Sequence, residues 1–331
     1  MKTLLKTRAV LLLLALTPAT EVVAAEKSAP TAIAIQASRT TLLDLAAAGK
    51  SLVVVGERGV IGRSDDGGDT WQLRQAPTSR SLTAVTFVDD RIGVAVGHGG
   101  TILRTEDGGL TWAAIAVKEI GRDAVLGVTA LKNGHLVAFG AFGMYLVSED
   151  QGETWHRQSV IAENFERHIS RVIETSSGMF LVGETGVMAR STDGGRRWSE
   201  LKSPYEGSYF GLLELRDGAL LAYGMRGNVY RSSNQGATWE QVPFASKATI
   251  NGGSVAADGR VVLAGNRGLL AVSSDAGRSF EITIAPEGTS LAQARLLDDG
   301  TLVYAGSMAT GRLRMKAANA HDAMTVAGAS K

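Results

Sequence analysis

The chain has 331 residues, of which 34 are lysine or arginine and 33 are aspartate or glutamate, and its formal net charge is +1. This balance excludes the overall basic excess typical of non-specific nucleic-acid binding. The absence of cysteine excludes disulfide frameworks, thiol nucleophiles and thiolate metal sites. With 40 glycines, 6 prolines and 44% hydrophobic residues, the composition favours many short elements joined by tight turns around a large core.

The first 25 residues have the pattern of a secretory signal peptide. Lys2, Lys6 and Arg8 precede an apolar run over residues 9–16, and the small residues Ala24 and Ala25 follow. The run is too short to span a bilayer, and no later stretch reaches the roughly 20 apolar residues that a membrane helix needs. We therefore expect an exported, periplasmic protein, which can be peripheral to a membrane complex but does not insert into the bilayer.

An eight-residue phrase, Ser/Thr-x-Asp-x-Gly-x-Thr-Trp, then recurs through the chain. Its first residues stand 41, 43, 43, 41 and 41 positions apart, and periods of about 40 to 50 residues are typical of propeller blades or solenoid units. The six copies of this box span residues 64–71, 105–112, 148–155, 191–198, 232–239 and 273–280.

Two glycines three positions apart precede each box, as in Gly56 and Gly59. Apolar runs flank the pair, which predicts a hairpin turn between two strands, with glycine supplying a positive φ. In the second repeat we expect four strands, A to D, over residues 82–88, 92–96, 101–104 and 112–117. Four short strands per repeat predict a propeller blade.

The two ends of the chain set the number of blades. Residues 291–297, 301–305 and 312–315 predict three strands of a seventh blade that has no box, and residues 32–35 form an unassigned apolar strand. We expect an all-β, seven-bladed propeller over residues 26–315, with the ring closed by the N-terminal strand joining the last blade. Closure in this way protects sheet edges. Residues 316–331 are expected to be a flexible tail.

The box is interpreted as structural. Its hydroxyl and carboxylate groups can bond to their own turn backbone, and its indole can be buried with the N–H partnered. A calcium or glycan site at each aspartate is the alternative, but an oxygen-ligand metal site needs six or more oxygens, so we expect no metal and no cofactor. The structural box residues are Asp66, Asp107, Asp150, Asp193, Asn234, Asp275, Trp71, Trp112, Trp155, Trp198 and Trp239.

The repeats resemble the Asp-box repeats of the BNR type, found in sialidases and many secreted propellers. The longer phrase over residues 183–198, Gly-Glu-Thr-Gly-Val-Met-Ala-Arg-Ser-Thr-Asp-Gly-Gly-Arg-Arg-Trp, is most similar to the photosystem II stability/assembly factor family, departing at Arg197 where Thr is expected. The resemblance implies a seven-bladed exported propeller, without known catalysis, that binds a membrane-protein assembly partner through an arginine-rich patch.

Basic residues recur on the face opposite the boxes. One series precedes strand A and a second lies in the glycine turns, and together they are the predicted partner-binding residues: Arg39, Arg80, Arg122, Arg167 and Lys247 in the first, and Arg58, Arg226 and Arg267 in the second. Clustered arginine suits contacts to carboxylates and is favoured at interface hot spots. Apolar residues expected on the same face are Phe142, Phe165, Tyr205, Tyr209 and Phe210.

One alternative stays open for these basic residues. They can be solvated loop residues, some paired with Glu119, Glu163, Glu166 or Glu206. A further arginine series at the end of strand C, comprising Arg63, Arg104, Arg190 and Arg231, is interpreted as structural.

Catalysis has little support. A sialidase-like hydrolase needs an arginine triad, a tyrosine activated by a glutamate, and an acid. Tyr205 and Glu206 form the only such neighbouring pair, and adjacent strand residues point to opposite faces. The five histidines fall in separate repeats and form no close ligand pair. We expect a non-enzymatic, monomeric scaffold that binds a membrane-associated protein or assembly intermediate; the alternative is a carbohydrate-binding or sialidase-like glycoside hydrolase propeller.

Overall fold

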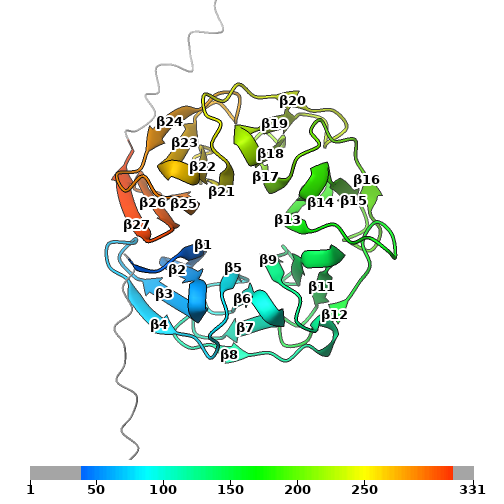
Figure 1. The fold of residues 1–331 in the computed structure, drawn as a ribbon, viewed down its shortest axis with the longest axis vertical. Coiled ribbons are helices and arrows are strands. Elements are labelled where there is room, and N and C mark those ends of the chain that lie inside the picture. Colours follow the sequence, from blue (N-terminus) through cyan, green and yellow to red (C-terminus); the bar gives the residue numbers. More distant parts are fainter. Residues whose placement is uncertain (1–38, 316–331) are drawn as a thin grey trace, which may run out of the picture. The chain divides into compact units, whose positions relative to one another are not determined.

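The computed structural model describes residues 39–315, which form seven antiparallel sheets in chain order (Figure 1). The first sheet contains β1 (Leu42–Ala48), β2 (Ser51–Gly56), β3 (Val60–Ser64) and β4 (Gln72–Gln75). The second contains β5 (Leu82–Phe87), β6 (Gly93–Gly97), β7 (Thr101–Thr105) and β8 (Ala113–Ala114), and the third β9 (Val125–Ala130), β10 (Leu136–Gly140), β11 (Tyr145–Ser148) and β12 (His156–Arg157).

The remaining sheets follow the same plan. The fourth contains β13 (Ile169–Thr175), β14 (Gly178–Gly183), β15 (Met188–Ser191) and β16 (Ser199–Glu200). The fifth contains β17 (Tyr209–Glu214), β18 (Leu220–Gly224), β19 (Val229–Ser232) and β20 (Glu240–Gln241), and the sixth β21 (Ile250–Val255), β22 (Val261–Gly265), β23 (Leu269–Ser273) and β24 (Glu281–Ile284). The seventh contains β25 (Leu291–Leu296), β26 (Thr301–Gly306) and β27 (Ala309–Arg314).

The sheets are the blades of a propeller, which confirms the predicted seven. In each blade the first strand lies at the centre of the ring and the last described strand at the rim (Figure 1). The fourth strand of the second blade is shorter than predicted, since β8 has only two residues where six were expected. Within residues 39–315, no helix is long and apolar enough to cross a membrane.

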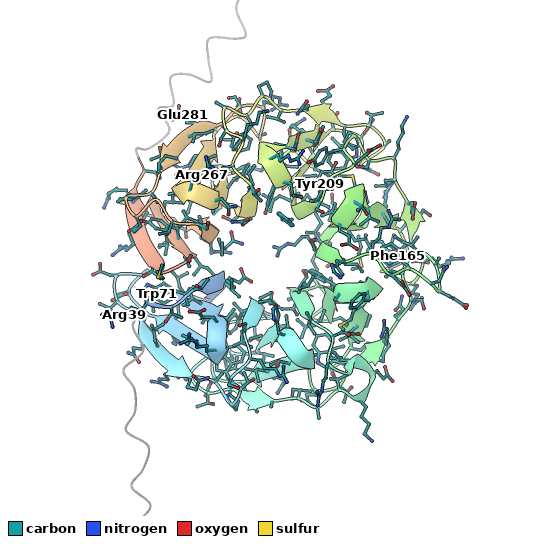
Figure 2. The ribbon with its side chains drawn as sticks, in the orientation of Figure 1. Arg39, Trp71, Phe165, Tyr209, Arg267 and Glu281 are labelled. Atoms are coloured by element: carbon teal, nitrogen blue, oxygen red, sulfur yellow. The ribbon has the colours of Figure 1, made fainter. Side chains whose placement is uncertain are left out.

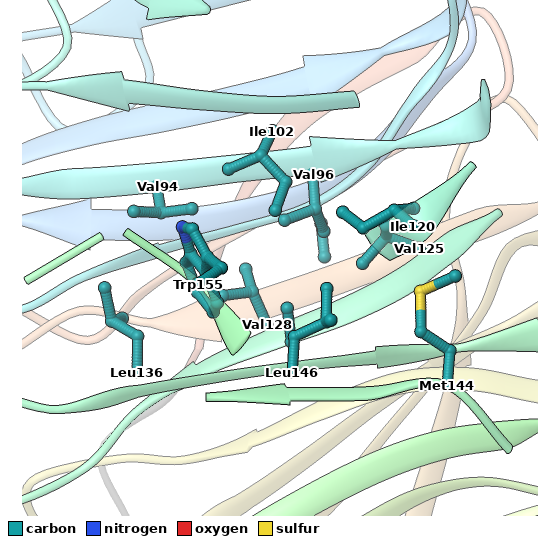
Figure 3. Close-up of a cluster of buried hydrophobic side chains, with 12 residues drawn as sticks. Val94, Val96, Ile102, Ile120, Val125, Val128, Leu136, Met144, Leu146 and Trp155 are labelled. Carbon is teal, nitrogen blue, oxygen red and sulfur yellow. The ribbon is translucent and has the colours of Figure 1, made fainter. Parts of the chain in front are cut away.

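The core is a series of layers between neighbouring blades. The second strands β2, β6 and β10 are buried along their whole length, because both faces of each blade pack against another blade. One cluster joins Val94 and Val96 of the second blade to Val128, Leu136 and Leu146 of the third, with Trp155 among them (Figure 3).

The seventh blade has three strands in the described part of the chain. The predicted closing strand at residues 32–35 lies outside the described residues, so this mode of closure stays a prediction. Blade 7 does contact blade 1 directly: Thr41 forms an antiparallel bridge with Ser307, the Met308 N–H donates to the Thr40 carbonyl at 3.2 Å, and Arg312 pairs with Asp69 at 2.7 Å.

The glycine pairs lie in the turns between second and third strands, as predicted, but only the second glycine needs a positive φ. Gly59 has a φ of 70°, whereas Gly56 is extended at −165°. Gly56 is required for a different reason: a Cβ built on it would lie 2.2 Å from the Thr41 carbonyl oxygen. The prediction was therefore wrong about the cause at the first glycine, which permits close backbone contact.

Candidate functional site: a basic face of the propeller

The two predicted basic series lie on one face of the ring. In every blade, the first residue of the turn between the second and third strands donates its N–H to the carbonyl of the residue just before the first strand, at 2.7–3.1 Å. Glu57 thus donates to Thr41, and Asn266 to Thr249. These bonds hold each inter-blade link against a glycine turn. We call this surface the basic face, defined by Arg39, Arg58, Arg80, Arg122, Arg167, Arg226, Lys247 and Arg267.

Each link also contacts the turn of the preceding blade. The Gly100 N–H donates to the Asp123 carbonyl at 2.8 Å, and the Gly143 N–H to the Arg167 carbonyl at 3.1 Å. Links and turns therefore alternate around the ring, which places the basic residues in two arcs. The longer arc contains Arg39, Arg58, Arg80, Arg122 and Arg167, and the shorter contains Arg226, Lys247 and Arg267; Figure 2 shows Arg39 and Arg267 on different sides of the last blade.

The side chains in the turns project from a left-handed backbone that the sequence did not predict. Arg58, Arg226 and Arg267 have φ values of 56°, 57° and 61°. The equivalent position in the other blades is Gly99, Phe142, Thr185 or Met308, all with positive φ. Since non-glycine residues seldom adopt this conformation, the turn backbone is held by its bonds to the link. These seven positions are called the tips below.

Most of the basic face has no internal partner. Arg39, Arg58, Arg80, Arg122, Arg226, Lys247 and Arg267 are exposed. Within residues 39–315, none of these seven side chains takes part in an ion pair or donates a hydrogen bond. Arg167 is the exception, because it pairs with Glu200 at 3.0 Å and lies over the Phe165 ring.

Three carboxylates of the same face accept backbone N–H groups. Glu57 accepts the Thr41 N–H at 3.0 Å, and Glu184 accepts the His168 N–H at 2.8 Å and lies 3.2 Å from its ring Nδ1. Glu119 accepts the Arg157 N–H. Among the described residues, no ion pair joins these arginines to Glu119, Glu163, Glu166 or Glu206, so their guanidinium groups stay available for a partner.

Arg80 is positioned by a glycine. A Cβ built on Gly99, the tip of blade 2, would lie 2.6 Å from Arg80 Nη1 and 2.7 Å from its Cδ. The Arg80 side chain therefore lies across this tip, where a larger residue would displace it. The absence of a side chain at Gly99 is the sequence signal that could have indicated this arrangement.

The apolar residues predicted for this face divide into two groups. Phe142 is 56% exposed and Phe210 is 36% exposed, and the structure adds Met308, a tip that is 54% exposed. Phe165 and Tyr205 are partly buried. Tyr209 was wrongly predicted: it is fully buried, because it occupies the first position of β17, which points into the core.

A pocket of about 480 Å³ lined by Leu43, His98 and Asn251 opens at the centre of the ring on the side of the basic face.

The Asp boxes lie on the opposite face, in the turns after the third strands, and bond to themselves. In the third box, Ser148 Oγ donates to Asp150 at 2.8 Å and accepts the Gly152 N–H at 2.7 Å, while Asp150 accepts the Thr154 N–H at 2.9 Å. The carboxylate is thus satisfied within the turn. In residues 39–315 no cluster of three or more metal-ligating side chains is present.

The box also joins adjacent blades, which the sequence did not reveal. Arg104 of blade 2 donates from Nε to the Gln151 carbonyl in the box of blade 3 at 2.9 Å, and Arg231 donates in the same way to Ala276 at 2.9 Å. Arg63 donates to Gly108. Three members of the strand-C arginine series therefore connect consecutive blades, which agrees with their structural interpretation. Arg190 differs by donating to Ser177 in its own blade at 2.7 Å.

The box carboxylates should make the fold sensitive to acid. Burial raises the pKa of Asp150, but bonds from Thr154 and Ser148 outweigh it and leave the pKa below its ordinary value of 3.8. The pKa of Asp66 is also lowered, chiefly by the hydrogen bond from the Thr70 hydroxyl. The pKa of Asp193 is lowered chiefly by the hydrogen bond from the Arg197 backbone N–H. A lowered pKa in the folded state stabilises the protein above pH 3.8, and this stabilisation is lost as the pH falls through the folded-state pKa. Unfolding monitored by urea titration is expected to become easier below pH 4.

Asp150→Asn is the matched test of that prediction. Asn234, which occurs naturally at this position, still accepts the Thr238 N–H at 2.9 Å. We expect Asp150→Asn to cost less than about 1 kcal/mol of unfolding free energy at pH 7 and to weaken the acid dependence. A calcium-dependent rise in melting temperature that Asp150→Asn removes would contradict the structural interpretation.

Comparison with known proteins places these features in a family. A family profile described as photosynthesis system II assembly factor YCF48 matches residues 23–133 and 122–253. No curated protein matches the chain in sequence.

Solved structures share the fold at low sequence identity. A structure described as YCF48 bound to D1 peptide is 20% identical with a TM-score of 0.69, and the match covers 84% of this chain and 93% of that one. YCF48 from Cyanidioschyzon merolae is 17% identical with a TM-score of 0.65, covering 81% and 93%. Virginiamycin B lyase from Staphylococcus aureus, in its selenomethionine form, is 15% identical with a TM-score of 0.72, covering 84% and 96%.

These structures support only the propeller fold, because enzymes and binding proteins both appear among them. The family profile carries more weight, since it matches well over half of the chain and spans repeats that contain both the box and the glycine turn. The chain belongs to the photosynthesis system II assembly factor YCF48 family.

Proposed function

We propose that this protein is a non-enzymatic, exported assembly factor that binds a membrane-associated protein, or an assembly intermediate of one, through the basic face. The observation that carries the proposal is the set of seven exposed basic side chains that have no partner within residues 39–315. Unpaired guanidinium groups are available for bidentate bonds to carboxylates of a partner. Membership in an assembly-factor family agrees with this role, and a YCF48 structure contains a bound D1 peptide.

The apolar residues of the same face extend the proposed interface. Phe142 and Met308 project from tips, and Phe210 lies beside the ring opening in the first strand of its blade. Protein interfaces combine buried aromatic and arginine anchors with a polar rim. The predicted partner therefore presents an acidic surface that also carries apolar side chains.

Charge reversal tests the proposal. Arg39, Arg80 and Arg122 belong to one arc, so the variant Arg39→Glu, Arg80→Glu, Arg122→Glu is expected to reduce recovery of membrane proteins in a crosslinking pull-down at least about 100-fold. Removing charged anchors typically costs 2 kcal/mol or more each. Because the three side chains are exposed and unpaired, the melting temperature is expected to stay within a few degrees of the wild-type value.

A triple reversal on the opposite face is the control. Arg91, Arg196 and Arg216 are exposed and lie in turns on the side of the Asp boxes, so their replacement by glutamate changes the net charge equally. This control is expected to capture the partner as the wild type does. Equal loss in both variants would assign the effect to net charge, and unchanged capture in the first variant would remove the basic face as the interface.

Export is tested in the same cells. The proposal expects the recovered bait to begin at Glu26, after removal of residues 1–25, and to be found in the periplasmic fraction. A bait of full-length mass confined to the cytoplasm would contradict export without bearing on the interface.

A further inference from the structure

The opening of the ring on the side of the Asp boxes contains a pocket that the proposed function does not use. It has a volume of about 450 Å³ and lies at the turns between first and second strands of blades 6, 7 and 1. In an up-and-down antiparallel blade these turns share a face with the Asp boxes, so the pocket opens away from the basic face. Its walls include Leu52, Val255 and Leu296, and its cations are Lys50 and Arg295.

Arg295 is a cation without a close partner. Its side chain is partly buried in the first strand of the last blade. Among residues 39–315, the Arg295 guanidinium forms no ion pair within 4 Å and donates no hydrogen bond. Burial lowers the pKa of Arg295, and the charge of Asp44 partly opposes this shift. A guanidinium nevertheless stays protonated in proteins, so the pocket holds a permanent positive charge.

Asp44 does not neutralise this charge by direct contact. Its carboxylate accepts the Leu45 N–H at 2.8 Å and the Val85 N–H at 2.9 Å. Burial raises the pKa of Asp44. The hydrogen bond from the Val85 N–H and the charge of Arg171, from blade 4, oppose this rise. Asp44 thus lies close enough to both Arg171 and Arg295 for the charges to influence each other, but within residues 39–315 no ion pair joins it to either arginine.

The charges at the pocket itself also favour an anion. Lys50 is exposed at the turn between β1 and β2 and has no ion-pair partner in the described part of the chain. The acidic lining residue, Asp298, is exposed at the turn after β25 and is well solvated there. The guanidinium nitrogens of Arg295 are not among the fully buried, unpartnered atoms of the described residues, so a ligand in the pocket can reach them. An anion there would pair with Arg295 through charge-assisted hydrogen bonds.

We propose that this pocket binds a small oxyanion, a carboxylate or phosphomonoester with a short apolar part, through Arg295 and Lys50. The planar guanidinium fork matches two oxygens of such a group, and Lys50 supplies a second charge at the entrance. Leu52, Val255 and Leu296 contact the apolar part. This ligand is independent of the partner proposed for the basic face.

The experiment measures binding of two probes, butyrate and phenyl phosphate, by isothermal titration calorimetry. At least one is expected to bind the wild-type protein, and the tighter of the two identifies the preferred oxyanion. Arg295→Gln is expected to weaken binding about 10- to 100-fold, as the loss of charge-assisted hydrogen bonds does. Lys50→Gln should weaken it less, because Lys50 is exposed.

Controls separate a binding role from a structural one. Arg216→Gln removes an arginine of the same face whose Nη1 donates to the Asp258 carbonyl at 3.0 Å, and it should leave affinity unchanged. Without probe, Arg295→Gln is expected to melt within a few degrees of the wild type, because within residues 39–315 no hydrogen bond or ion pair of the Arg295 side chain is lost. The proposal is overturned if neither probe binds at 10 mM, a concentration about tenfold above a weak 1 mM Kd, or if Arg295→Gln binds as the wild type does. Retained partner capture by Arg295→Gln would show that the two sites are separate.

Discussion

Replacing Trp155 by alanine is expected to lower the free energy of unfolding by about 3–5 kcal/mol. The indole is 8% exposed and belongs to the cluster that joins blades 2 and 3. Its Nε1 donates to the Gly152 carbonyl at 3.2 Å, so the substitution removes apolar contacts on both sides of the blade interface and leaves a cavity. Urea unfolding monitored by circular dichroism measures the change.

Trp155→Phe is the matched control, since the sixth box carries Phe280 at this position. Phe280 packs against Phe244 with ring centroids 5.6 Å apart, which shows that a smaller ring can occupy the site. The phenylalanine variant is expected to lose less than half as much stability as the alanine variant. Equal losses would mean that the indole N–H, and not the ring volume, supports the interface.

Gly140→Ala is expected to destabilise the protein by about 3 kcal/mol, at the upper end of the range for overpacking. A Cβ at Gly140 would lie 2.2 Å from the Ala124 carbonyl oxygen and 2.9 Å from the Leu126 nitrogen. Both obstructions are backbone atoms, which cannot move aside as the end of a side chain can. Relief would require the link before β9 to shift, and this link carries Arg122.

Gly194→Ala provides the comparison for Gly140→Ala. Gly194 has a φ of 76°, but nothing lies within 4 Å of a Cβ built on it. Its substitution should cost only the strain of a left-handed backbone, about 1–2 kcal/mol. Thermal unfolding of the two variants separates these causes, and a smaller loss for Gly140→Ala than for Gly194→Ala would refute the steric explanation.

The sequence predicted the blade count and register well because one local phrase recurs once per repeat. The phrase satisfies its own hydrogen bonds, as Ser148 and Asp150 show, so its geometry needs no information from distant residues. The buried state of Tyr209 could also have been predicted. The equivalent first-strand positions hold Leu42, Leu82 and Ile169, all buried, and alignment of the repeats would have placed Tyr209 with them.

Other features depend on contacts between repeats and left no local signal. The need for glycine at position 140 is explained by the carbonyl oxygen of Ala124, which leaves no room for a Cβ. The hydrogen bond from Arg104 to the Gln151 carbonyl links residues 47 positions apart. The repeat predicts that Arg104 lies at the end of the third strand, but it does not predict which carbonyl accepts the bond. The isolation of Arg295 is likewise visible only when the charges around the ring opening are placed in space.

The seven tips combine a fixed backbone with side chains that are little constrained by packing. Their backbone is held in one conformation by hydrogen bonds between the turn and the link, while their side chains, such as Arg58, Phe142 and Met308, project into solvent. Arginine, phenylalanine, threonine, methionine and glycine all occur there with the same backbone. At the six tips that already carry a side chain, the strain of the left-handed backbone is present whichever residue stands there, so one side chain can replace another with little further cost to the fold. The recognition chemistry of this surface can therefore change one blade at a time.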